Sequence, residues 1–65
     1  MGKEKNKMIR ILKSVALGDK TYQEIALLST DTKPTAGIAT GSIAFVVDEG
    51  NFYAFDEESG EWKVQ

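Results

Sequence analysis

Two short acidic stretches contain the residues of this chain whose types and spacing are best suited to chemistry. Residues 56–61 read Asp-Glu-Glu-Ser-Gly-Glu, and Asp48 and Glu49 precede them. Carboxylate oxygens bind Ca²⁺, but an EF-hand loop that began at Asp56 would need its glycine at the sixth position, where Glu61 stands. Paired carboxylates also act in acid–base catalysis, provided that a cleft desolvates one of them. Both stretches have the composition of solvated turns, so we predict neither a metal site nor a catalytic pair.

The composition removes most other catalytic chemistries. The chain of 65 residues has no histidine, which is the commonest general base and a common metal ligand. It also has no cysteine, which excludes disulfides and thiolate metal sites. A domain of this size buries only about 60% of the surface that its unfolded chain exposes. We therefore predict a protein that is not an enzyme and that needs no cofactor.

The amino-terminal segment is basic and offers a second kind of site. It contains Lys3, Lys5, Lys7, Arg10 and Lys13. Lysines in such a cluster can bind phosphates, but proteins that bind single strands interleave the basic residues with aromatic ones. Here the chain is acidic overall, with a net charge of −2, and its aromatic residues lie mostly in the acidic half. We favour a protein partner, and a small adaptor that binds nucleic acid or protein through this arm is the alternative.

The aromatic residues of the last third could serve as a binding platform. Tyr53 and Trp62 could stack against sugar rings, which makes a carbohydrate-binding module a further alternative. A small chain also needs its aromatic side chains for the core, because each buries about 150–250 Å². Neighbouring residues of a strand point to opposite faces of the sheet. We therefore expect Phe52 on one face and Tyr53 and Phe55 on the other. We expect the surplus to form a protein interface rather than a small-molecule groove.

The same third of the chain predicts an antiparallel β-meander. Residues 43–47 are apolar on both faces of a strand, residues 52–55 resume with β-favouring aromatic residues, and residues 62–64 alternate after the acidic turn. Residues 8–17 match a helical stripe and a strand about equally well; we favour two strands joined at Gly18. The fold class is therefore mainly β, with about four to five strands. The expected core is Ile25, Leu27, Ile43, Phe45, Val47, Phe52, Phe55 and Trp62.

The domain organisation follows from composition. Residues 1–7 are charged and terminal, which predicts a mobile basic arm, and residues 8–65 form one small domain. Residues 29–42, here called the connector, are rich in Ser, Thr and Gly and contain Pro34, which disfavours a central strand. No apolar run approaches the roughly 20 residues of a membrane span, and the start lacks the apolar core of a signal peptide. We expect no membrane partner.

Two segments together resemble small structural proteins of tailed bacteriophages and prophages. In that pattern a TKPT connector precedes a Gly-Ser, an apolar strand, a VDTG-like turn, a YxF strand and a GEW strand. The matching residues are Lys33-Pro34-Thr35, Gly41-Ser42, Val47-Asp48-Glu49-Gly50, Tyr53 to Asp56 and Gly60-Glu61-Trp62. The match covers a little over half of the chain, and Glu49 stands where the pattern usually has Thr.

The resemblance implies a virion-associated protein that acts as a head-decoration, neck or tail accessory component. Its partners would be capsid or tail subunits, with self-association as a further option, and it would reside in the host cytoplasm before assembly and in the virion afterwards. Many weak contacts on a lattice would add up through multivalency. The expected interface residues are Tyr53, Phe55, Trp62, Lys33, Pro34, Thr35, Lys5 and Lys7.

Overall fold

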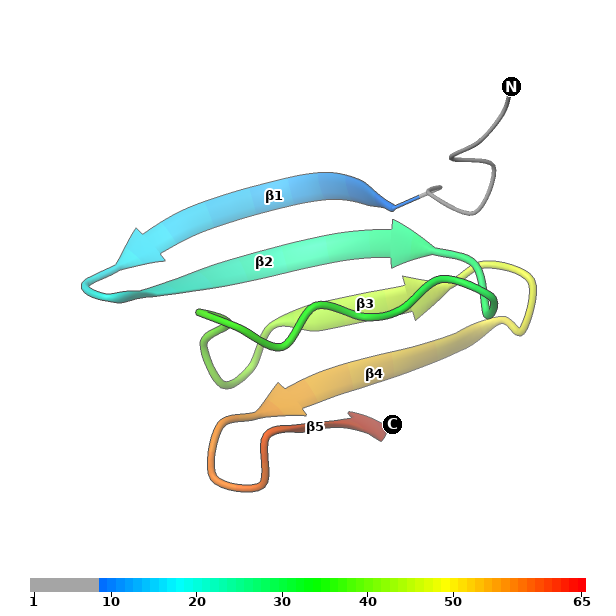
Figure 1. Ribbon diagram of the computed structural model, residues 1–65. Coiled ribbons are helices and arrows are strands. Elements are labelled where there is room, and N and C mark those ends of the chain that lie inside the picture. Colours follow the sequence, from blue (N-terminus) through cyan, green and yellow to red (C-terminus); the bar gives the residue numbers. More distant parts are fainter. Residues whose placement is uncertain (1–8) are drawn as a thin grey trace.

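The computed structural model describes residues 9–65, which form one five-stranded sheet (Figure 1). The strands are β1 (Arg10–Leu17), β2 (Lys20–Leu27), β3 (Ile43–Val46), β4 (Asn51–Asp56) and β5 (Glu61–Val64). They lie side by side in chain order. A mainly β fold of four to five strands is thereby confirmed. The sheet is mixed rather than wholly antiparallel, because β2 and β3 run parallel while the other neighbouring pairs are antiparallel. The expected arm over residues 1–7 lies outside the described residues.

Glycines with positive φ close the tight turns, as the sequence predicts. Gly18 has a φ of 70° and joins β1 to β2, so residues 10–17 form a strand and not a helix. Gly50 has a φ of 73° between β3 and β4. L-residues with a side chain rarely adopt this conformation, whereas glycine adopts it at little steric cost. These two positions therefore fix where the hairpins turn.

The connector returns the chain from the end of β2 to the start of β3 across one face of the sheet (Figure 1). Such a crossing is what parallel neighbours require, since a tight hairpin can join only antiparallel strands. Near its end the connector adds a short parallel bridge, in which Thr21 donates to Gly37 and accepts from Ala39. Ile38 and Ala39 are buried there. The connector thus forms a second layer over part of the sheet.

The core lies on the face that the connector covers. Its centre is Ile25 and Leu27 of β2 beside Ala44 and Val46 of β3. In register with these, β4 and β5 contribute Tyr53, Phe55, Trp62 and Val64 to the same side. We call this side the covered face.

Part of the expected core is wrong. Val47 is 52% exposed and Phe52 is 51% exposed, while Ile43 and Phe45 are only half-buried. All four side chains point to the side of the sheet opposite the connector, because they alternate with residues of the covered face. Ile25, Leu27 and Phe55 are buried as predicted, and Trp62 is half-buried.

Candidate functional site

The residues that carry the phage-like pattern come together and hold the connector on the sheet. The indole Nε1 of Trp62 donates a hydrogen bond of 2.8 Å to the carbonyl oxygen of Pro34. Beside it, the Lys33 ammonium lies 4.3 Å from the centroid of the Tyr53 ring, within the range of a cation–π contact. Both rings come from neighbouring strands of the covered face. These four residues, expected at an interface, make an internal contact.

The other expected interface residues lie in different surroundings. Phe55 is only 4% exposed and packs against Trp62 with ring centroids 5.1 Å apart, so its ring belongs to the core. Thr35 is exposed on the connector. Lys5 and Lys7 lie outside the described residues. The structure therefore does not gather the six described residues of this set into one exposed surface.

Each end of the connector is tied to a turn of the sheet. Ser29 donates from its backbone nitrogen and its hydroxyl to the two carboxylate oxygens of Asp48, at 2.9 and 2.6 Å. The hydroxyl bond, followed by the backbone bond, lowers the pKa of Asp48 below its ordinary value. At the other end, Thr40 donates to Glu57 at 2.8 Å and accepts from the Glu57 backbone at 2.9 Å. The sequence predicts only solvated turns for these acids, and in the structure Asp48 and Glu57 also anchor the connector.

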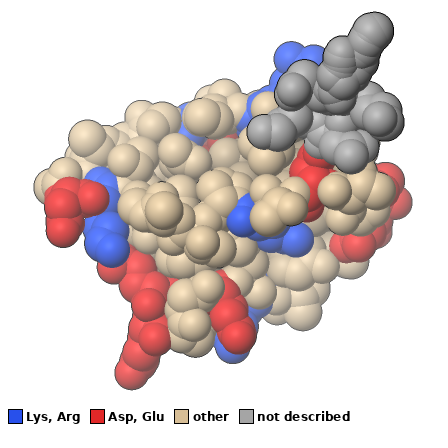
Figure 2. Space-filling view, in the orientation of Figure 1, with Lys and Arg blue, Asp and Glu red and all other residues tan. Residues whose placement is uncertain are grey.

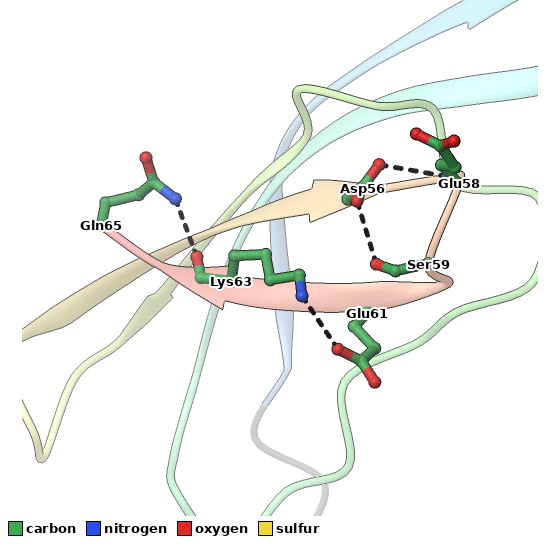
Figure 3. A network of polar contacts seen from close by, with 6 residues as sticks. All are labelled: Asp56, Glu58, Ser59, Glu61, Lys63 and Gln65. Atoms are coloured by element: carbon green, nitrogen blue, oxygen red, sulfur yellow. Dashed lines mark hydrogen bonds and ion pairs between the residues drawn. The ribbon is translucent and has the colours of Figure 1, made fainter.

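The acidic loop after β4 bonds within itself (Figure 3). The carboxylate of Asp56 accepts from the Glu58 backbone at 3.1 Å and from the Ser59 hydroxyl at 3.0 Å. Lys63 pairs with Glu61 at 3.1 Å. In residues 9–65 no group of three or more acidic side chains is arranged to hold a metal ion. Figure 2 shows acidic side chains mainly around the margins of the molecule in this view, with a largely neutral centre.

The opposite side of the sheet, which we call the open face, carries an apolar surface. It contains Val15 and Leu17 of β1, Tyr22 of β2, Ile43 and Phe45 of β3 with Val47 after it, and Phe52 and Ala54 of β4. The rings of Phe45 and Phe52 are registered partners and stack with centroids 4.6 Å apart. No other element of residues 9–65 forms a layer over this side of the sheet.

Charged side chains lie around the apolar centre of the open face. By register they are Arg10, Lys13, Lys20, Glu24, Asp56, Glu61 and Lys63. The hydroxyl of Tyr22 donates to the Glu24 carboxylate at 2.6 Å, and this bond raises the pKa of Tyr22. On the covered face Tyr53 similarly donates to Glu49 at 3.1 Å, which raises its pKa. The sequence held one signal for the open face, since residues 43–47 are apolar on both sides. From the sequence alone, the larger residues Ile43, Phe45 and Val47 are expected in the core.

Comparisons with known proteins add no assignment. A scan against protein-family models, a search of curated proteins and a search of solved structures each found no match. Within residues 9–65 no helix is long and apolar enough to cross a membrane. The described residues place the stacked rings of Phe45 and Phe52 on one face of the sheet and the bonded connector on the other.

Proposed function

We propose that this protein is a non-enzymatic structural component of a phage-like particle, and that it binds a neighbouring subunit through the open face. The observation that carries the proposal is the exposed stack of Phe45 on Phe52 with Val47 beside it. A sheet normally buries both faces or leaves one face polar. Here the centre of the second face is apolar and aromatic and charged residues lie around it, which is the composition of an interface with a polar rim.

The partner surface is apolar by the same argument. Burying a valine or phenylalanine side chain against a partner contributes about 1.5–3 kcal/mol, so a few such residues give a contact of useful strength. The resemblance supplies the setting, because Lys33-Pro34-Thr35 and Gly60-Glu61-Trp62 belong to the pattern of phage structural proteins. Repetition of the contact over a particle would strengthen it further.

The first test is to count this chain in purified phage-like particles by quantitative mass spectrometry, relative to the major capsid protein. A ratio near that of the capsid protein supports a head-lattice component, and a few copies per particle support a neck or tail component. Absence from well-purified particles overturns the proposal.

A matched pair of variants tests the surface itself. Val47 on the open face and Val64 on the covered side are similarly exposed, at 52% and 61%. We expect Val47→Lys to reduce incorporation into particles at least tenfold, because it places a charge in an apolar contact, and Val64→Lys to leave incorporation unchanged. Equal loss in both variants, with both folded by circular dichroism, contradicts the assignment of the open face.

A further inference from the structure

We propose that β1 of one copy pairs with β5 of a second copy, so that the sheets of successive copies join edge to edge. This inference goes beyond the proposed function and uses different residues from the open-face stack. Among the described residues β1 and β5 are the two outer strands, each with one neighbour (Figure 1). An outer strand presents unpaired backbone groups that can extend a ladder onto another chain.

The β1 edge has the properties of a strand that is completed by a partner. Every one of its eight residues is exposed. Four of them are large aliphatic residues, exposed by 40–66%: Ile11, Leu12, Val15 and Leu17. Soluble proteins usually shorten such edges or cover them, because a long apolar edge promotes association.

Strand directions make the two edges compatible. β1 is antiparallel to β2, and β3 runs in the same direction as β2. β4 runs opposite to β3, and β5 runs opposite to β4. β5 therefore runs antiparallel to β1. A second copy shifted sideways in the plane of the sheet, without rotation, places its β5 antiparallel to this β1, and the open faces of both copies stay on the same side.

The lengths of the two edges also match. The register of β1 shifts between Ile11 and Lys13, where a bulge interrupts the ladder. Beyond the bulge, residues 13–17 are regular, and β5 has four residues. Since a bulge ends regular pairing, it confines the partner to the same part of β1 that β5 can span.

The charges of the two edges favour pairing of β1 with β5 of a second copy over pairing of β1 with β1 of a second copy. β1 carries Arg10 and Lys13 and no acid, a charge of +2. β5 itself carries Glu61 and Lys63, and the turn before it adds Glu57 and Glu58, so residues 57–64 together have a charge of −2. Glu57 also lies 3.8 Å from the Lys20 ammonium of its own chain. Pairing β1 with β1, or β5 with β5, brings like charges together, whereas pairing β1 with β5 brings opposite charges together. Contacts of this kind are head to tail, so they generate rings or filaments rather than closed two-fold dimers.

The test uses the full chain and measures the weight-average mass by sedimentation equilibrium as a function of protein concentration. The wild type is expected to associate, and association is expected to weaken with added salt, which screens exposed charges. Lys13→Glu changes the charge of β1 from +2 to 0, which removes its attraction to the acidic residues of the other edge, and it should lower the association constant at least tenfold. Lys63→Glu is the same chemical change on β5; it makes that edge more acidic and should leave association equal or stronger.

A mixing experiment separates edge pairing from other effects. Lys13→Glu places an acid opposite Glu24 in the sheet, so its fold is checked by a thermal melt. Glu61→Lys alone should also weaken association, because it changes the charge of residues 57–64 from −2 to 0. An equimolar mixture of the Lys13→Glu and Glu61→Lys variants should associate more strongly than either variant alone. In the mixture the acidic residues 57–64 of the first variant, with a charge of −2, can meet β1 of the second variant, with a charge of +2.

Three results overturn the inference: a monomer at every concentration, equal weakening by Lys13→Glu and Lys63→Glu, or no recovery in the mixture. Val47→Lys distinguishes the two proposals. It changes the open face only, and it should leave edge association intact while it reduces incorporation into particles. A monomer that still enters particles therefore removes edge pairing and leaves the proposed function in place.

Discussion

Ser42 should be one of the most sensitive positions in the fold. It is completely buried, and its hydroxyl oxygen accepts a hydrogen bond of 3.0 Å from the backbone nitrogen of Gln23. The parallel ladder between β2 and β3 begins one residue later, at Glu24 and Ile43. The serine side chain therefore adds one bond to the ladder where β3 starts. Ser42→Ala removes the acceptor and leaves that nitrogen without its partner.

The size of the effect follows from the surroundings of that nitrogen. A buried donor left without a partner costs about 1–3 kcal/mol. Gln23 is half-buried, so we expect a loss in the lower part of this range, about 1–2 kcal/mol. A domain of 65 residues has a total stability of roughly 3–10 kcal/mol. The loss corresponds to a fall in Tm of roughly 4–16 °C.

Urea unfolding measures this change, with the fluorescence of Trp62, the sole tryptophan, as the signal. Trp62 packs against Phe55 on the covered face, so its emission reports the packing of that face. Ser14→Ala is the matched control, because Ser14 is exposed on β1 and the chemical change is the same. A loss below about 0.5 kcal/mol for Ser42→Ala, the usual limit for surface changes, or a loss equal to that of the control, would refute the reasoning.

Three further predictions concern the turns and the connector. The pKa of Asp48 in the folded protein should lie below 3.8 by NMR titration, and Ser29→Ala should raise it. The stabilisation from the Asp48 carboxylate is therefore fully present above the pKa of the unfolded state and is lost as the pH falls through the pKa of the folded state. A pKa of Asp48 that is unchanged in Ser29→Ala would contradict the role of the Ser29 hydroxyl. Gly50→Ala should destabilise by about 1–2 kcal/mol because φ is 73°, whereas D-alanine placed there by chemical synthesis should be tolerated. Trp62→Phe should lower the free energy of unfolding by about 1 kcal/mol and speed amide hydrogen exchange in the residues around Pro34, because it removes the bond to the Pro34 carbonyl. Unchanged exchange would mean that this bond does not hold the connector on the sheet.

Local signals in the sequence predict the strands and turns well. Gly18 and Gly50 stand where the chain needs positive φ, and the β-favouring residues on either side of each glycine form strands. The parallel pairing of β2 with β3 was not predicted. Nothing in the composition of the connector says at which end of β2 the chain re-enters the sheet, because this depends on contacts between residues far apart in the sequence, such as the bridge from Thr21 to Ile38.

The choice of covered face was harder still to predict. β3 has Ile43 and Phe45 on one side and Ala44 and Val46 on the other, and side-chain size favours the first pair for the core. The structure buries the second pair, because the connector and the rings of β4 and β5 pack over that side. Small residues fit beneath a second layer made of backbone and aromatic rings. Size alone is therefore a poor guide when both sides of a strand are apolar.

The residues of the recognisable pattern and the residues of the proposed interface have different tasks. Pro34 with Trp62, and Lys33 with Tyr53, attach the connector to the covered face. Substituting them should release the connector and lower stability, so any loss of binding would be a secondary effect of partial unfolding. Phe52 on the open face is half exposed, so we expect its substitution to cost the fold little beyond the loss of its stack on Phe45, about 0.5–1.5 kcal/mol. A search for function guided by the pattern alone would therefore report on folding, and the partner has to be sought from the open face.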